Sequence, residues 1–198
     1  LLRWTRAPKV RVGVFFVREK NGKLRLIIDA RRTNQRFRTP PGAALSSAEA
    51  FSDVECEPGQ KVFISTTDVD DCFYKMRISK EVSAFFALPP VTAGSVGISK
   101  LDEEILASDD LVYPCFSCLP MGCSWSLLFA QHANAGLSGG VEALKNATQL
   151  YDGSCPAVFY RRAGGGRRLA FFVYVDNIGI MGIDEAGVNA AMVEGRRR

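Results

Sequence analysis

Two aspartates that end apolar segments are the residues of this sequence best suited to chemistry. Asp68 follows the segment 62–67, and Asp176 follows Phe171-Phe172-Val173-Tyr174-Val175 roughly a hundred residues later. β-Branched and aromatic residues favour strands, so each carboxylate is expected at the end of a strand. A carboxylate on a mostly buried strand is unfavourable unless a cation lies beside it. The pattern predicts a divalent metal site, and two carboxylates on adjacent strands could hold a pair of ions.

The segment around Asp176 is expected to form a β-hairpin. Asp176-Asn177 separates the apolar runs 171–175 and 178–181, and Asn with Gly179 close behind it suits a tight turn. This predicts the Asp176-Asn177 pair at the hairpin tip. On this stretch alone, an ordinary turn explains the pair as well as a metal site does.

Asp68 is also part of an acidic cluster. Asp70 and Asp71 follow it closely, and three carboxylates within four positions repel one another unless a cation is near. Asp is common in the first turn of a helix, which accounts for Asp70 and Asp71. It does not account for Asp68 at the end of the preceding strand.

A basic hairpin is expected near the start of the chain. Strands are predicted over 10–17 and 24–29, joined by Lys20-Asn21-Gly22-Lys23, in which Asn-Gly is a strong turn signal. The net charge is +4, and basic residues crowd the first forty positions. Such a block favours a polyanionic partner through counterion release, with a solvated basic face as the alternative.

The remaining segments indicate a mixture of helices and strands in one domain or two lobes. Helices are expected over 43–51, capped by Ser46 or Ser47, over 125–135 with residues 125, 128, 129 and 133 on its apolar face, and over 141–150. A strand followed by a turn marked by Pro and Gly is expected over 113–124, a strand over 169–175, a loop with one short helix over 89–111, and a hairpin tip at the glycine run 164–166. The chain has no run of 18 apolar residues and no charged-then-apolar leader, which argues against membrane insertion and secretion. Its unusual ends suggest a fragment of a longer protein.

Six cysteines without a secretory leader predict reduced thiols in an intracellular protein, in the cytoplasm or nucleus. Cys115 and Cys118, with Cys123 and the only histidine, His132, superficially suggest a zinc site. Their spacing is irregular for zinc. A zinc-binding interaction module therefore stays as one alternative.

Four segments together resemble the motifs of the reverse transcriptases, particularly those of retroelements. The segment 23–34, with Asp29, Arg31 and Asn34, resembles the fingers signature, and 67–78 resembles motif A. Leu119-Pro120-Met121-Gly122 resembles the turn of motif B, and Tyr174-Val175-Asp176-Asn177 resembles motif C. The resemblance runs from about Val10 to Met181, and four motifs in the family's order are far more specific than any one alone.

This resemblance implies an α+β fold and a division into subdomains. The palm of a right-hand polymerase, a small antiparallel sheet backed by helices, would accompany a fingers subdomain, with the thumb missing. Fingers would comprise 1–42, and the palm with motif A would comprise 43–78. A fingers insertion leading to motif B would span 79–125, and the palm with motif C would span 126–198.

The resemblance also implies a role for each matching residue. Asp68 and Asp176, with the Val69 carbonyl, would hold Mg²⁺ or Mn²⁺, and Asn177 would complete the catalytic set. The nucleotide-binding residues would be Lys20, Lys23, Arg25, Phe73, Met121 and Gly122. Phe73 would exclude a ribose 2′-hydroxyl, although it could instead be a core aromatic. Tyr174 would lie near the primer end.

Two substitutions depart from the family's pattern. Asn177 stands where the second motif C aspartate is usual; an Asn oxygen can ligate a metal, but it adds no negative charge. Met121 stands where Gln is usual, which removes a polar contact with the nucleotide. The sequence also lacks the primer grip and thumb that would follow motif C.

The function expected from the sequence is template-directed DNA synthesis. A primer 3′-hydroxyl would attack the α-phosphate of a deoxynucleotide on an RNA or DNA template, with no membrane involved. One alternative is a catalytically decayed relative that only binds nucleic acid, which Asn177 favours. Another is an RNA-dependent RNA polymerase, which usually has a polar residue instead of an aromatic one near the ribose.

Overall fold

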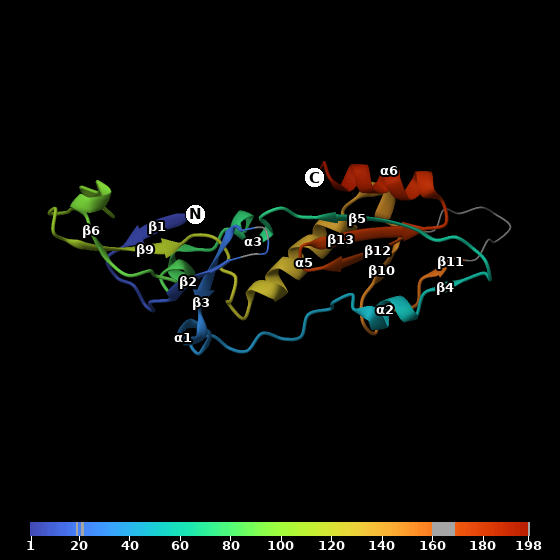
Figure 1. Ribbon diagram of the computed structural model, residues 1–198, viewed down its shortest axis with the longest axis horizontal. Coiled ribbons are helices and arrows are strands. Elements are labelled where there is room, and N and C mark those ends of the chain that lie inside the picture. Colours follow the sequence, from blue (N-terminus) through green and yellow to red (C-terminus); the bar gives the residue numbers. More distant parts are fainter. Residues whose placement is uncertain (19, 21, 160–168, 198) are drawn as a thin grey trace. The chain divides into compact units, whose positions relative to one another are not determined.

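A computed structural model describes residues 1–18, 20, 22–159 and 169–197 (Figure 1). The chain forms two compact units. Unit 1 comprises Leu1–Pro40 and Asp71–Ser126, and unit 2 comprises Pro41–Asp70 and Leu127–Arg198. Each unit is therefore built from two separate stretches of sequence.

Unit 2 is organised around a four-stranded sheet. Its strands are β5 (Phe63–Asp68), β10 (Thr148–Leu150), β12 (Leu169–Tyr174) and β13 (Asn177–Gly182), in the order β10-β12-β13-β5. The pairs β12–β13 and β13–β5 are antiparallel, whereas β10 pairs with β12 in parallel. The strand over 148–150 corrects the helix expected over 141–150, of which only the 3₁₀ turn η2 (Glu142–Leu144) is present.

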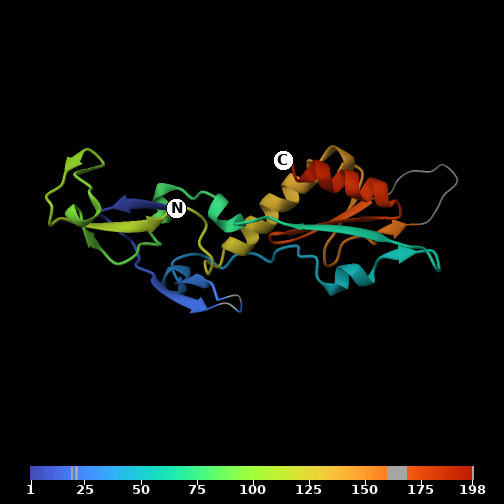
Figure 2. The same cartoon turned by 45° about the horizontal axis from the view of Figure 1, so that its top comes forward.

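Alternation along the strands sends apolar side chains to both faces of this sheet. On one face, Phe171, Val173 and Ile180 pack against Val188 and Met192 of helix α6 (Glu185–Gly195). On the other, Ala170, Phe172 and Met181 pack with helix α2 (Ala48–Ser52) and with Phe159 of β11 (Val158–Phe159), a short strand that pairs in parallel with β4 (Glu55–Cys56). Figure 2 shows α2 and α6 on opposite sides of the sheet.

Helix α5 (Ser126–Gly139) has a different buried face from the one expected. Leu128 is buried as predicted, but Phe129 is 50% exposed and Ala133 is also exposed. The polar residues Gln131, Asn134 and Ser138 are buried in their place. Hydrogen bonds to backbone groups of unit 2, described below, explain why the carboxamides of Gln131 and Asn134 are inside.

Unit 1 contains the basic hairpin and a small sheet. The hairpin strands are β2 (Gly13–Arg18) and β3 (Leu24–Asp29); the sheet has the order β1 (Leu2–Thr5), β9 (Leu111–Phe116) and β6 (Val91–Thr92). The short helices are α1 (Arg31–Asn34), α3 (Cys72–Lys75) and α4 (Lys80–Ser83). The expected loop over 89–111 carries β6, the 3₁₀ turn η1 (Gly94–Val96), and the two-residue strands β7 (Lys100–Leu101) and β8 (Glu104–Ile105).

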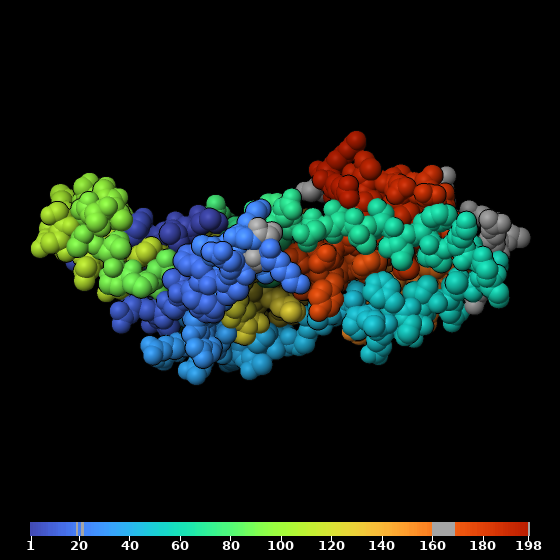
Figure 3. Space-filling view, in the orientation of Figure 1, coloured from blue at the N-terminus to red at the C-terminus, as the bar shows by residue number. Residues whose placement is uncertain are grey.

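The core of unit 1 lies beneath the base of the hairpin. Val12, Ile28, Phe86, Phe116 and Cys118 form one buried cluster, and a smaller cluster holds Ala93, Leu106 and Val112. Every residue of β2, in contrast, is exposed. Figure 3 shows this hairpin, in blue, on the viewed surface of unit 1.

Several expected elements are present with shifted ends. The strand 24–29 is β3 as predicted, the cap of α2 is Ser47, and β12 ends at Tyr174. Asn21 and the glycine run 164–166 lie outside the described residues. In the described part of the chain, no helix is long and apolar enough to cross a membrane.

Candidate active site

The candidate site is built at the turn between β12 and β13. Tyr174 pairs with Asn177, so the two-residue turn consists of Val175 and Asp176. The expected tip, Asp176-Asn177, was therefore one residue too far along the chain. Gly179, expected to help the turn, instead lies inside β13 directly opposite Phe172.

Val175 adopts a backbone conformation that is rare for its residue type. Its φ is +60°, while Asp176 has no positive φ, a combination found in type II′ turns. Glycine is usual at this first position because a β-branched side chain is strained there by about 1–3 kcal/mol. Such strain persists only where surrounding contacts over-determine the backbone, and α5 provides those contacts.

Gln131 of α5 fixes the turn from inside unit 2. Its Oε1 accepts a hydrogen bond from the Val175 N–H at 2.7 Å, and its Nε2 donates to the carbonyl oxygens of Val173 at 2.9 Å and Ala44 at 2.7 Å. One turn further along, Asn134 Nδ2 donates to the Val175 carbonyl oxygen at 2.7 Å. Gln131 is 1% exposed and Asn134 is 2% exposed, so water does not compete for these bonds. Both peptide groups of Val175 are thus held.

The sheet register brings the two expected carboxylates together. Asp68 at the end of β5 lies directly opposite Asn177, and the Val69 N–H donates to the Asp176 carbonyl oxygen at 2.9 Å. Asn177 Nδ2 donates to Asp176 Oδ1 at 3.1 Å. Asp68 and Asn177 are exposed, and Asp176 is half-buried. Two strand ends and a constrained turn therefore place Asp68, Val69, Asp176 and Asn177 side by side.

The oxygen donors of this group are of the type that Mg²⁺ and Mn²⁺ prefer. They comprise two carboxylates, the Asn177 amide oxygen and nearby backbone carbonyls. Across the residues the structure describes, no group of three or more His, Cys, Asp or Glu side chains is placed to hold a metal. The set fits an ion held by one or two carboxylates, with water and substrate phosphates as its other ligands.

One face of the sheet is open beside these carboxylates. Side-chain alternation places Tyr174, Asn177 and Asp68 on the face opposite α6, together with Thr66 and Ile64. Tyr174 is 46% exposed and Ile64 is 56% exposed. An incoming molecule could therefore contact both this exposed face of the sheet and the carboxylates.

The expected nucleotide-binding residues all lie in unit 1. Lys20, Lys23 and Arg25 are exposed on the β2–β3 hairpin, and Phe73 is half-buried in α3. Met121 is half-buried next to Gly122. Their roles in binding a nucleotide stay predictions.

The turn at Gly122 has a structural need for glycine. Its φ is +103°, and a Cβ there would lie 2.7 Å from the Ile28 carbonyl oxygen. Asn34 fastens this turn: its Nδ2 donates to the Gly122 carbonyl oxygen at 3.0 Å, and its Oδ1 accepts from the Ser124 N–H at 3.0 Å. The sequence placed Asn34 in a motif without a role, and the structure supplies this one.

An ion pair precedes that contact in the same motif. Arg31 Nε and Nη2 donate to the two carboxylate oxygens of Asp29, at 2.8 and 2.6 Å. These hydrogen bonds lower the pKa of Asp29 to about 2. Because Arg31 is 87% exposed, the pair contributes little to overall stability.

The cysteines considered for zinc are in unfavourable surroundings for a thiolate. Cys115 and Cys118 are buried, and burial raises the pKa of the Cys115 thiol to about 11 and also raises that of Cys118. Zinc needs deprotonated thiols. Together with the lack of a three-residue metal group in the described part of the chain, this gives the zinc alternative no support.

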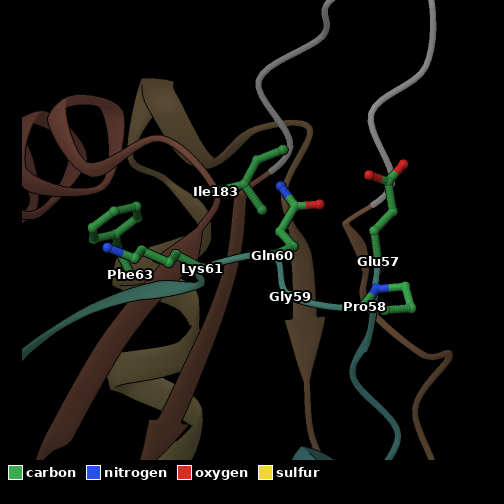
Figure 4. Close-up of a pocket in the computed structure, with 7 residues that line it drawn as sticks. All are labelled: Glu57, Pro58, Gly59, Gln60, Lys61, Phe63 and Ile183. Carbon is green, nitrogen blue, oxygen red and sulfur yellow. The ribbon is translucent and has the colours of Figure 1, made fainter.

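A pocket of about 450 Å³ lies elsewhere in unit 2 (Figure 4). Its lining includes Gln60 and Phe63, at the start of β5, and Ile183, just after β13. Gly182 pairs with Phe63, whereas Asn177 pairs with Asp68. The pocket is therefore at the opposite end of these strands from the carboxylates and is not part of the candidate site.

Comparison with solved structures identifies similar folds. The crystal structure of native Prototype Foamy Virus Protease-Reverse Transcriptase matches 98% of this chain with a TM-score of 0.58 and 17% sequence identity. Its CSH mutant, labelled with selenomethionine, matches 96% with the same TM-score and identity. This chain spans 19% of the length of each. No protein-family model and no curated protein sequence matches it.

At this identity the likeness shows the fold alone. The chain has a mixed fold of helices and small, mainly antiparallel sheets, similar to a fragment of a retroviral reverse transcriptase.

Proposed function

We propose that this chain carries the nucleotidyl-transfer site of a template-directed DNA polymerase of the reverse-transcriptase type. The observation that carries the proposal is the placement of Asp68, at the end of β5, next to Asp176, in the turn that leads into the neighbouring strand β13 and is held by buried carboxamides. Phosphoryl transfer depends mainly on positioning and charge stabilisation, which a constrained carboxylate pair suits. The fold similarity supports the proposal independently of the motifs.

Each residue of the site would have a distinct task. Asp68, Asp176 and the Val69 carbonyl would hold Mg²⁺ or Mn²⁺, which when bound activates a hydroxyl and neutralises phosphate charge. Lys20, Lys23 and Arg25 would hold the triphosphate of a deoxynucleotide, while Met121 and Gly122 would support its base. Phe73 would exclude a ribose 2′-hydroxyl. Tyr174, on the open face, would contact the primer end.

The second candidate is a relative that binds primer and template without catalysis. Asn177 favours it, because this neutral side chain lies directly opposite Asp68 where a third carboxylate would strengthen cation binding. The two candidates predict the same nucleic-acid binding. They differ in incorporation of nucleotides.

Template-primed incorporation of deoxynucleotides, with Mg²⁺ and with Mn²⁺, separates these candidates. Asp68→Ala should reduce incorporation roughly a thousandfold or more, because metal-centred charge stabilisation is worth several kcal/mol. Asn177→Asp should raise it roughly tenfold, since a nearby negative charge strengthens cation binding. Asp53→Asn, which removes an exposed carboxylate at the end of α2, is the matched control and should have no effect.

The pattern of outcomes decides between the readings. Incorporation only after Asn177→Asp identifies a decayed polymerase. Absence of incorporation in every variant, with primer–template still bound, overturns the catalytic proposal and leaves the binding protein. An RNA polymerase would prefer ribonucleotides in the unmodified protein, whereas a DNA polymerase should gain ribonucleotide use only with Phe73→Val.

A further inference from the structure

Unit 1 contains a strongly basic cleft that none of the motifs accounts for. It has a volume of about 530 Å³ and is lined by Lys9, Val10, Arg11, Arg32, Gln35 and Arg36. Four of these six residues are cationic and none is acidic. We refer to this site as the basic cleft.

The charges of the basic cleft are only partly compensated nearby, by Asp29, whose carboxylate interacts electrostatically with Arg32. Among the described residues, none of the four cations takes part in an ion pair, whereas the neighbouring Arg31 is paired with Asp29. Like charges held close together repel one another, and an anion bound between them relieves that repulsion. The cleft therefore has the electrostatic character of an anion site.

Both walls of the cleft are anchored to one segment, residues 84–87, in which Phe86 and Ala87 are buried and Ala84 and Phe85 are half-buried. From the first wall, the Lys9 and Val10 N–H groups donate to the Ala84 carbonyl oxygen at 2.8 and 3.3 Å. From the second, Thr33 of α1 is fully buried and its Oγ1 donates to the Phe85 carbonyl oxygen at 2.6 Å. The distance between the walls is thus fixed by the fold before any ligand binds, which reduces the entropy lost on binding.

Aromatic contacts reinforce this frame. The Lys9 Nζ lies 4.8 Å from the centre of the Phe85 ring, in cation–π geometry, so the first cation is positioned. Phe37, just beyond Arg36, packs against Phe85 with ring centres 5.1 Å apart and against Phe86 at 6.4 Å. The second wall is therefore supported between its two arginines by Thr33 and just after them by Phe37.

We infer that the basic cleft binds the sugar–phosphate backbone of single-stranded nucleic acid. Arginine forks suit phosphate oxygens, and such contacts position a strand without reading its sequence. A concave site of this volume accommodates a ligand the size of one or two nucleotides, which favours a single strand over a duplex. The inference rests on the proposed function only in taking nucleic acid as the substrate, and it does not involve Lys20, Lys23 or Arg25.

Fluorescence anisotropy with a labelled 12-nucleotide single strand tests the inference, with chelator present and deoxynucleotides absent. The test variant is Arg32→Gln with Arg36→Gln. Lys61→Gln with Lys100→Gln is the control, because both lysines are exposed elsewhere and the net charge changes equally. The test variant should bind roughly tenfold more weakly. The slope of log affinity against log salt concentration, here called the salt slope, should fall in magnitude by about 1.4 when two phosphate contacts are lost. The control should change neither quantity.

Further measurements distinguish a lost phosphate contact from misfolding of the variant. Both arginines are exposed, so the melting temperature should be unchanged, and Arg32→Lys with Arg36→Lys should restore most of the salt slope because the charge returns. Equal slopes in the test and control variants would overturn the inference. So would the same loss of affinity for a duplex of that sequence, or full competition by tripolyphosphate at equal phosphate concentration.

The result is separable from the polymerase proposal. Binding that depends on the cleft in a protein that incorporates no nucleotide supports the cleft and counts against catalysis. Nucleotide incorporation by a protein whose single-strand binding is unchanged by the cleft substitutions supports catalysis and counts against the cleft.

Discussion

The two hairpins of this protein have similar sequence signals and opposite environments. In unit 1, every residue of β2 is exposed, including Phe15 and Phe16. In unit 2, β12 lies between β10 and β13 with half of its residues buried and only Tyr174 exposed, and its turn is held by Gln131 and Asn134. The first hairpin presents charges to solvent, and the second fixes a carboxylate in one geometry. Apolar strand residues are therefore exposed to solvent in the first hairpin, whereas in the second they pack into the core that supports the turn.

Hydrogen exchange should show the largest difference between the hairpins. We expect the amides of 169–174 to exchange at least a hundredfold more slowly than those of 13–18, because exposed elements with few buried contacts open at low free energy. Exchange measured by mass spectrometry on peptides covering each strand checks this. Equal protection would contradict the contrast between the two hairpins.

Gln131→Ala should remove the hydrogen bonds that hold the turn of the second hairpin. The change deletes three hydrogen bonds and leaves the Val175 N–H without its acceptor, whereas the Val173 carbonyl oxygen keeps a hydrogen bond from Ser46 Oγ, so we expect a loss of about 2–3 kcal/mol. Urea unfolding measures it. The control is His132→Ala on the exposed side of the same helix, which should lie within about 0.5 kcal/mol of the unmodified protein.

Gly179→Ala tests how closely the second hairpin is packed. A Cβ at Gly179 would lie 2.0 Å from Cζ of the Phe172 ring, so we expect overpacking to destabilise the protein by about 1–3 kcal/mol. Gly136→Ala is the matched control: it lies in α5 with open space around it and should be stabilising by about 0.5–1 kcal/mol. Adding Phe172→Leu should recover much of the loss, and failure to do so would show that the ring is not the cause.

Val175→Asn should act in the opposite direction. Asn tolerates positive φ, so the substitution should stabilise the protein by about 1 kcal/mol. The equivalent change in the first hairpin, Val17→Asn, falls on an exposed strand residue and should destabilise by less than about 1 kcal/mol. Thermal unfolding of both variants measures the signs. Destabilisation by Val175→Asn would mean that packing of the valine outweighs the backbone strain.

Arg31→Gln should produce the smallest effect, at the base of the first hairpin. Without its partner, the pKa of Asp29 should rise from about 2 towards the ordinary value of 3.8, as NMR titration of the carboxyl carbon would show. Because folding lowers this pKa, the stabilisation is present above pH 3.8 and is lost as the pH falls towards 2. A stability difference between the two proteins that persists at about pH 2 would contradict this assignment.

Much of the framework could be predicted from the sequence because it follows local rules. The strand 24–29 was correct, Ser47 caps α2, and the apolar runs before Asp68 and Asp176 are strands. The β12–β13 turn was predicted one residue too far along the chain because valine rarely adopts a positive φ. Here hydrogen bonds from α5, which is distant in sequence, hold Val175 in that conformation. The helix expected over 141–150 is wrong because residues 148–150 form a strand that pairs with residues 170–172, 22 positions further along the chain.

The residues that support the site, Gln131 and Asn134, could not be identified from the sequence. Gln131 and Asn134 resemble the polar positions of an amphipathic helix, and nothing local indicates that they face inward. One signal was available: their spacing of three residues places both on one side of the helix, close to Leu128, which the pattern had assigned to the buried face. Asn34 was visible as part of a motif, but its two bonds to the Gly122 turn depend on a loop nearly ninety residues away.

The side chains of α5 that fasten the backbone of the turn beside Asp176 do so through carboxamide groups. Neither Gln131 nor Asn134 titrates, so the shape of the turn should be the same in acid and at neutral pH, and in low and high salt. The conformation of the turn therefore does not depend on the charge of the side chain at position 177. A lineage could exchange aspartate for asparagine at position 177, or reverse the exchange, and change its affinity for cations without having to rebuild the fold.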